Sequence, residues 1–196
     1  MSRLSESSAL SRAATQAEID AQLEAAARSE LAALSQAAAK AENRFTEEQQ
    51  GWMREALYEA RLAFELGDVP VGAVLVADGE IIGRGHNRRE ADNDPCGHAE
   101  MIALTQAGKA LGSWRLSGAQ MYVTMEPCPM CAFALVLARV QLLVYGMSDQ
   151  RMGACGSFLN IAQFPGFGHA VSIRSGLYAD ESARLMRDFF NARRKD

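Results

Sequence analysis

Two short motifs in the sequence bring together residue types that bind a metal ion. His98-Ala99-Glu100 is followed, after a gap of 26 residues, by Pro127-Cys128-Pro129-Met130-Cys131. Cys128 and Cys131 are three residues apart, so at a helix start they share one face, where the helix dipole favours thiolates. One imidazole and two thiolates suit zinc, and three protein ligands leave its fourth tetrahedral position open. The motifs therefore predict a catalytic metal site.

Glu100 is the residue that separates an enzyme from a simple metal site. Its carboxylate is two residues from the ligand His98, close enough to take a proton from water on the metal. Two thiolates already balance the charge of a dication, so we expect Glu100 to act as general base and then as general acid. A lone C-x-x-C can also be a redox pair or a structural half-site, and a lone histidine is usually structural. The combination of both motifs favours the catalytic interpretation.

The composition is that of an ordinary globular protein. Of the 196 residues, 48% are hydrophobic and 22% are charged, which allows a buried core. The net charge of −4 argues against a general nucleic-acid coat but permits a local basic patch. Four cysteines, two of them in a C-x-x-C, indicate a reducing compartment, and neither a membrane span nor a secretory signal is visible. We expect a cytoplasmic protein with no membrane association.

The first 45 residues differ from the rest of the chain. They contain fourteen alanines and no glycine, proline or cysteine, a composition that favours helix. Their larger apolar residues form only a thin stripe, which can bury little surface. We predict an Ala-rich, exposed, partly helical extension over 1–45, followed by a catalytic domain over 46–196. A docking arm for a partner or a second subunit is the alternative.

From Thr46 onward, helical and strand-like segments alternate. Thr46 and Gln49 form a capping box before apolar residues at helical spacing, and Gly67 suits the end of that helix. The other predicted elements include strands at 72–77, 81–85, 121–124, 142–145 and 171–173, and a polar loop at 87–97. Three further helices are predicted: one begins near His98, one spans about 128–138, and the closing one is capped by Asp180. Such alternation predicts a layered α/β domain, with helices covering a largely buried sheet.

The two motifs together are the signature of the cytidine deaminase-like superfamily. Longer segments resemble its bacterial tRNA-specific adenosine deaminases, in order and without large gaps from about residue 46 to 195. These segments are 68–76, 85–87, 93–95, 98–100, 122–128, 153–157, 165–169, 179–181, 188–190 and 193–194. The resemblance implies an α/β/α fold with a mixed five-stranded sheet, and hydrolytic deamination of adenosine to inosine at the wobble position, 34, of a tRNA anticodon.

The resemblance also assigns roles to individual residues. His98, Cys128 and Cys131 would hold one zinc ion per chain. Glu100 would pass protons from the zinc-bound water to adenine N1 and then to the leaving amino group. The positions that match substrate contacts are Asn87, the backbone of Ala99 and Glu126, Asp149 and Arg151 in one loop, and Phe190, Arg193 and Arg194 in the closing helix. The implied partner is a tRNA anticodon stem-loop.

Each of these substrate contacts has a structural alternative. Asn87 could close the turn after its strand, and Asp149 could be an ordinary turn residue. Phe190 could pack on the sheet beside Phe189, and the arginines could form a solvated tail. Cys96 and Cys155 lie outside the motifs, and we expect structural roles for both.

Two positions depart from the family pattern. Cys96-Gly97 stands where the family usually has Thr-Ala, and Phe133 replaces a residue that is often small. Family members are homodimers, which makes the helix at 128–138 a candidate interface. Because this helix is apolar nearly all round, we expect it to be buried on more than one side.

Two other functions stay open. One is a related deaminase acting on a free base or nucleoside, such as guanine or cytosine. The other is a zinc-stabilised RNA-binding module without turnover. The loop at 148–156 and the basic closing helix favour the RNA-editing enzyme over the first. Glu100 argues against the second, because a closed structural site would have a fourth ligand there.

Overall fold

The computed structural model describes residues 21–30 and 44–194. The chain separates into two units between Arg44 and Phe45. Residues 21–30 of the first unit are helical and exposed, and the rest of the predicted N-terminal extension lies outside the described residues. Within the described ranges, no helix combines the length and the apolar character that crossing a bilayer requires.

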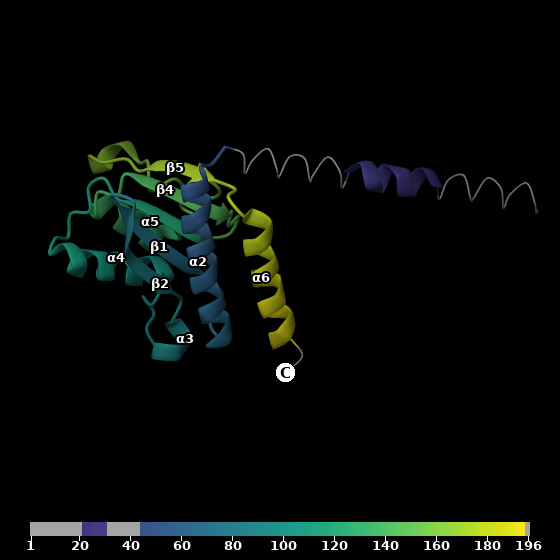
Figure 1. Cartoon of the computed structure of the whole chain (residues 1–196), viewed down its shortest axis with the longest axis horizontal. Helices are drawn as coiled ribbons and strands as arrows, with labels where there is room; N and C mark the ends of the chain where they lie inside the picture. Colours follow the sequence, from purple (N-terminus) through teal and green to yellow (C-terminus); the bar gives the residue numbers. More distant parts are fainter. Residues whose placement is uncertain (1–20, 31–43, 195–196) are drawn as a thin grey trace, which may run out of the picture. The chain divides into compact units, whose positions relative to one another are not determined.

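Five strands of the second unit form one mixed sheet, in the order β2-β1-β3-β4-β5 (Figure 1). The strands are β1 (Gly72–Ala77), β2 (Glu80–His86), β3 (Gln120–Met125), β4 (Leu142–Met147) and β5 (Ser172–Ser175). Strand β1 pairs antiparallel with both β2 and β3, whereas β3, β4 and β5 run parallel. Parallel neighbours need a crossover, and helix α5 (Pro129–Leu137) supplies it between β3 and β4. The expected mixed five-stranded sheet is confirmed.

Each face of the sheet has its own core, because successive strand residues point to opposite sides. Ala73 and Leu75 of β1 belong to a core that includes residues of α4 (Ala99–Leu111) and α5. Val74 and Val76 belong to a second core, with residues of α2 (Glu47–Glu65). Helix α6 (Ala179–Arg193) runs beside α2 (Figure 1), where the Phe64 and Phe189 rings lie 5.6 Å apart. Helices on both faces give the predicted three layers.

Two helix starts illustrate what local sequence can and cannot predict. The capping box at Thr46 and Gln49 is confirmed, with both reciprocal bonds at 3.2 Å. The prediction that Asp180 caps the closing helix is wrong. The N-cap of α6 is Tyr178, at φ 53°, and it makes no side-chain capping bond. Asp180 lies instead in the first turn, where its charge still complements the helix dipole.

The predicted polar loop contains a short helix, α3 (Arg89–Asp92). A distant residue stabilises its start. The buried carboxylate of Asp68 accepts the backbone N–H of Glu90 at 2.8 Å and that of Ala91 at 3.4 Å. Because the cap is 22 residues away in sequence, local turn signals could not reveal it.

Helix α5 is buried on one side only, so the prediction of burial on more than one side is wrong for the single chain. Cys131, Ala132, Leu135 and Val136 are buried. On the other side, Phe133 is 38% exposed and Leu137 is 57% exposed. The helix is an outer layer on the sheet, which leaves an apolar face uncovered by the described part of the chain.

Candidate active site

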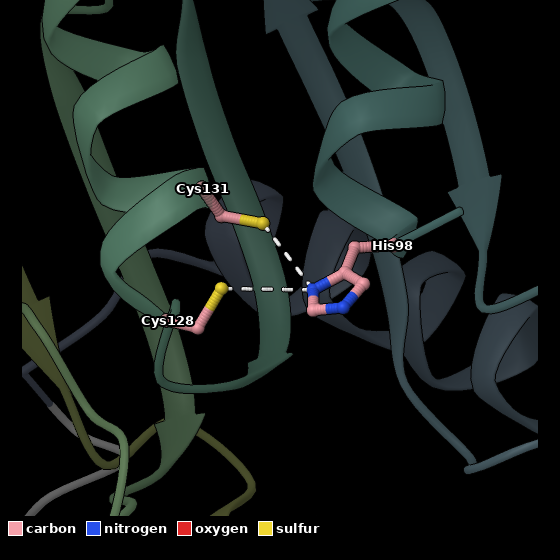
Figure 2. Close-up of side chains that lie close together, drawn as sticks. All are labelled: His98, Cys128 and Cys131. Atoms are coloured by element: carbon pink, nitrogen blue, oxygen red, sulfur yellow. Dashed lines mark hydrogen bonds between the residues drawn. The ribbon is translucent and has the colours of Figure 1, made fainter. Parts of the chain in front are cut away.

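The three predicted metal ligands meet where two helices begin. His98 is the N-cap residue of α4, and Cys128 is the N-cap residue of α5. The Nδ1 atom of His98 lies 3.6 Å from the Sγ of Cys128 and 3.5 Å from the Sγ of Cys131. Figure 2 shows the three side chains pointing toward one another from these two helices. Their donor atoms all lie within 4.8 Å of one another, so this group could hold a metal ion.

The start of α4 is held against strand β2 by a close backbone approach. A Cβ atom on Gly85 of β2 would overlap the carbonyl of Ala99, so only glycine allows this packing. Asn87, which follows β2, is buried, and its Oδ1 accepts the N–H of Ala99 at 3.1 Å. Asn87 thus fixes the first turn of the helix that carries His98 and Glu100.

The electrostatics of the cluster favour negative charge on one sulfur atom, that of Cys128. The Cys131 thiol donates a hydrogen bond to Cys128 and, with a further bond from His98, lowers the pKa of Cys128 to about 4. The same bonds raise the pKa of Cys131 and that of His98. Burial raises the pKa of Glu100, whose side chain is among the most enclosed in the site. A carboxyl group that holds its proton more readily than usual suits general acid–base chemistry.

A cavity of about 560 Å³ opens onto this cluster. This volume is within the range of small-molecule sites, at roughly 300–1,000 Å³. The cavity is lined by Val69, Val71, Asn87, Arg89, Pro95, His98, Glu100, Met125, Glu126, Cys128, Pro129, Met130, Asp149 and Met152. The structure therefore brings the predicted ligands and Glu100 together with three predicted substrate residues: Asn87, Glu126 and Asp149.

Comparison with known proteins identifies the family. Residues 47–194 match the MafB19-like deaminases. The tRNA-specific adenosine deaminase of Bacillus subtilis (strain 168) is 48% identical over 144 residues, which are 74% of this chain and 89% of the relative. The tRNA-specific adenosine deaminase of Streptococcus pyogenes serotype M18 is 43% identical over 149 residues, which are 76% of this chain and 94% of the relative. The chain belongs to the tRNA-specific adenosine deaminases.

Solved structures agree with this assignment. One, from a study of A-to-I editing by tRNA:A34 deaminases at the wobble position, is 46% identical to this deaminase with a TM-score of 0.67. The match covers 69% of this chain and 98% of the other. A guanine deaminase from Nitrosomonas europaea has a TM-score of 0.61 at 23% identity, covering 71% of this chain and 83% of the other, and it shares the fold.

Other predicted RNA contacts of the deaminase lie outside the cavity lining. Ala99 is fully buried, and Arg151 is exposed in the turn where its N–H binds the Asp149 side chain at 2.9 Å. Arg193 donates to the Gly67 carbonyl at 2.8 Å and lies over the Phe189 ring at 5.0 Å. For these residues, RNA contact stays a prediction.

The two phenylalanines of α6 separate in the structure. Phe189 is buried, whereas Phe190 is 46% exposed, so only Phe189 follows the packing alternative. Arg194 is exposed at the end of the helix. The two cysteines outside the motifs also differ, because Cys155 is buried while Cys96 is exposed, so the Cys96 thiol does not fill a core.

Eight of the fourteen cavity-lining residues are not among the predicted site residues, and Arg89 and Met152 are two of these eight. Arg89 lies on helix α3, in a segment where the sequence predicts a polar loop, and Met152 follows the predicted contact Arg151. A sequence signal existed for the first. Arg89 belongs to a basic pair directly after Asn87, between the hairpin and the metal-binding motif.

Proposed function

We propose that this deaminase converts the wobble adenosine, position 34, of a tRNA to inosine by hydrolysis. The observation that carries the proposal is the buried Glu100 carboxyl beside the His98, Cys128 and Cys131 donors, all opening onto one cavity. Relatives at 43–48% identity are named tRNA-specific adenosine deaminases, which supports the same substrate. The residues of the site and the names of these relatives therefore support one reaction.

We propose zinc as the metal, because the donor geometry fits it. Zn–S bonds of about 2.3 Å and Zn–N bonds of about 2.0 Å at a tetrahedral angle place sulfur and nitrogen about 3.5 Å apart. The observed Nδ1–Sγ distances are 3.6 and 3.5 Å. When bound, zinc supplies a Lewis acid that makes water a nucleophile near neutral pH. Three protein donors leave room for that water.

Glu100 carries the protons of the reaction. Its carboxylate accepts one proton from water as the water oxygen attacks C6 of the adenine, and delivers that proton to N1; it then accepts the proton of the new C6 hydroxyl and delivers it to the amino group, which departs as ammonia. Burial raises the pKa of Glu100, which helps the group keep the proton between these two steps. The Oδ1 of Asn87 is bonded to Ala99, which leaves its amide NH₂ to donate to the nucleoside. The target base must leave its stack to enter such a cavity.

A chain of contacts joins the cavity to the basic end of α6, which supports an RNA path along this edge. Arg89 lines the cavity, and its helix α3 is capped by Asp68. The neighbouring Gly67 carbonyl binds Arg193 of α6 at 2.8 Å. In Figure 1, α3 and the end of α6 lie at the same end of the domain. The sequence from 184 to 196 has five basic and two acidic residues, so phosphate attraction is local in an acidic protein.

We also propose a homodimer that pairs the exposed face of α5. Phe133 lies 5.0 Å from Phe167 between ring centroids, and Phe167 lies 4.9 Å from Phe164. These rings are 38%, 40% and 52% exposed, and Leu137 beside them is 57% exposed. A contiguous apolar patch of this kind is typical of an interaction site. Light scattering should give twice the chain mass, and Phe133→Asp with Leu137→Asp should give a monomer that still binds zinc.

The wobble base itself provides the test of function. Purified protein is incubated with a tRNA carrying A34, and the RNA is sequenced, since inosine reads as guanosine. Ammonia release is measured in parallel with adenine, guanine and cytosine. We expect conversion of adenosine to inosine at position 34, and no release of ammonia from the free bases. Release from guanine or cytosine alone would favour a free-base deaminase, and zinc binding without any turnover would indicate an RNA-binding module.

The cysteines of this deaminase bear on the cellular compartment in which it works. All four cysteines are free thiols, and two of them are the proposed metal ligands. Such thiols persist in a reducing environment. We therefore propose the cytoplasm as the compartment.

A further inference from the structure

Glu126 is a second buried carboxylate next to the cavity, and its contacts differ from those of Glu100. It lies between β3 and α5, two residues before Cys128, and is 3% exposed. Its Oε2 accepts the backbone N–H of Asp149 at 3.0 Å. Its Oε1 accepts the backbone N–H groups of Cys155 and Ser157, both at 3.0 Å. Both oxygens are therefore occupied by one segment of the chain.

That segment, residues 149–157, has turns and one isolated bridge but belongs to no helix or strand. It wraps closely around the carboxylate. A Cβ atom on Gly153 would lie 2.5 Å from the Oε2 of Glu126, so glycine is required at the point of contact. Asp149 and Met152 of the same segment line the cavity, and Met152 is 56% exposed. We call residues 149–157 the wall, because Asp149 and Met152 of this segment line the cavity.

We propose that Glu126 is a positioning residue, whose carboxylate fixes the 149–157 wall and thereby sets how tightly the RNA around the target adenosine is held. The inference rests on the proposed function. Glu126 moves no proton in this role. Its charge matters because a carboxylate offers lone pairs on both oxygens, enough for three N–H donors, and bonds to an ionised acceptor are about twice as strong as neutral ones.

The conservative variant Glu126→Gln separates charge and acceptor number from size. An amide oxygen in place of Oε1 keeps the bonds from Cys155 and Ser157. The amide nitrogen then faces the N–H of Asp149, so two donors oppose each other and that bond is lost. Glu59→Gln is the matched control, because Glu59 is also a buried carboxylate but binds the side chains of His86 and Arg84 away from the cavity.

The experiment measures kcat and KM on a tRNA anticodon stem-loop, zinc content, and amide hydrogen exchange of 149–157. For Glu126→Gln we expect KM to rise about tenfold, the cost of one hydrogen bond to a charged group. We expect kcat to change much less, zinc to stay at one per chain, and exchange across 149–157 to accelerate. Glu59→Gln should leave KM and this exchange as in the parent.

Three results would overturn the inference: an unchanged KM with unchanged exchange, a fall in kcat at constant KM, or loss of zinc. The second would make Glu126 a catalytic group, and the third would make it a support of the metal cluster.

Met152→Ala provides a further check. If Glu126 acts through the wall, the double variant should raise KM by less than the product of the single effects. Hydrogen exchange needs no RNA, so a parent protein that fails to edit would refute the proposed function while the wall is still tested.

Discussion

The metal cluster and the wall of the cavity are built in different ways. His98 and Cys128 are the N-cap residues of α4 and α5, and their donor atoms lie close together. The 149–157 wall has no regular element, and its backbone N–H groups are held by Glu126. Arg193 of α6 likewise binds its own chain, at the Gly67 carbonyl. We therefore expect chemistry to depend on a few side chains, and substrate binding to depend on many weaker, distributed contacts.

This difference predicts that changes in the cluster abolish turnover, while changes around it have graded effects. The largest loss is expected for Glu100→Gln. The attacking water then lacks its proton acceptor, so kcat should fall by about 10²–10⁴-fold on the scale of general acid–base catalysis. Zinc should stay near one per chain by metal analysis, because no ligand is changed. Near-normal turnover in this variant would refute the mechanism.

Cys128→Ala and Cys131→Ala are the counterparts of that variant. Each leaves two protein ligands, which bind zinc weakly, so metal and activity should be lost together. The same metal analysis and inosine assay distinguish this outcome from the Glu100 result. Retention of a full zinc complement in both cysteine variants would mean that the metal is held elsewhere.

Asn87 lines the cavity and also binds the start of the helix that follows His98. Its Oδ1 accepts the Ala99 N–H at 3.1 Å, and Asn87→Asp keeps an oxygen acceptor there while replacing the amide NH₂ with a second oxygen. We expect KM for the anticodon stem-loop to rise about tenfold or more, because a buried donor to the nucleoside becomes an acceptor. Zinc content should be unchanged. An unaltered KM would support the alternative in which Asn87 only closes a turn.

The sequence predicted the cluster well because its residues stand in two short motifs of characteristic spacing, even though His98 and Cys128 are 30 residues apart. A histidine, a glutamate and two cysteines at helix starts depend only on spacing and on strong helix signals such as Pro129. The start of α3 depends on Asp68, 22 residues away, and the wall depends on Glu126, at least 23 residues from its donors. Long-range side-chain-to-backbone bonds leave no periodic trace in a sequence, so α3, Arg89 and Met152 were missed.

The arginines at the end of α6 should have a smaller, salt-dependent effect. Arg193→Ala with Arg194→Ala should weaken tRNA binding and flatten its dependence on salt, because each phosphate contact releases counterions. Arg193 also ties α6 to Gly67, so Arg194→Ala alone is the cleaner variant. Binding titrations at two salt concentrations measure both effects. If the double variant binds as the parent does at both, the end of α6 is only a solvated tail, and Arg151 and Arg89 become the next candidates.

The smallest effect is expected from removing residues 1–44. These residues contain no candidate ligand, and the described part, residues 21–30, is exposed. Phe45 must remain, because its ring is 6% exposed in the core beside α2 and lies under Arg174 at 4.6 Å. A chain that begins with Met and Phe45 should therefore bind zinc, deaminate at a similar rate and unfold at a similar temperature. A chain that begins at Thr46 should lose about 1.5–3 kcal/mol of stability, the contribution of a buried phenylalanine, and unfold at a lower temperature.

Thermal unfolding, light scattering and the inosine assay on this matched pair of chains measure each effect. If the longer of the two chains precipitates, or is a monomer while the full chain is a dimer, then residues 1–44 are an assembly element. In that case the alternative of a docking arm holds, and the prediction of a solvated extension is wrong.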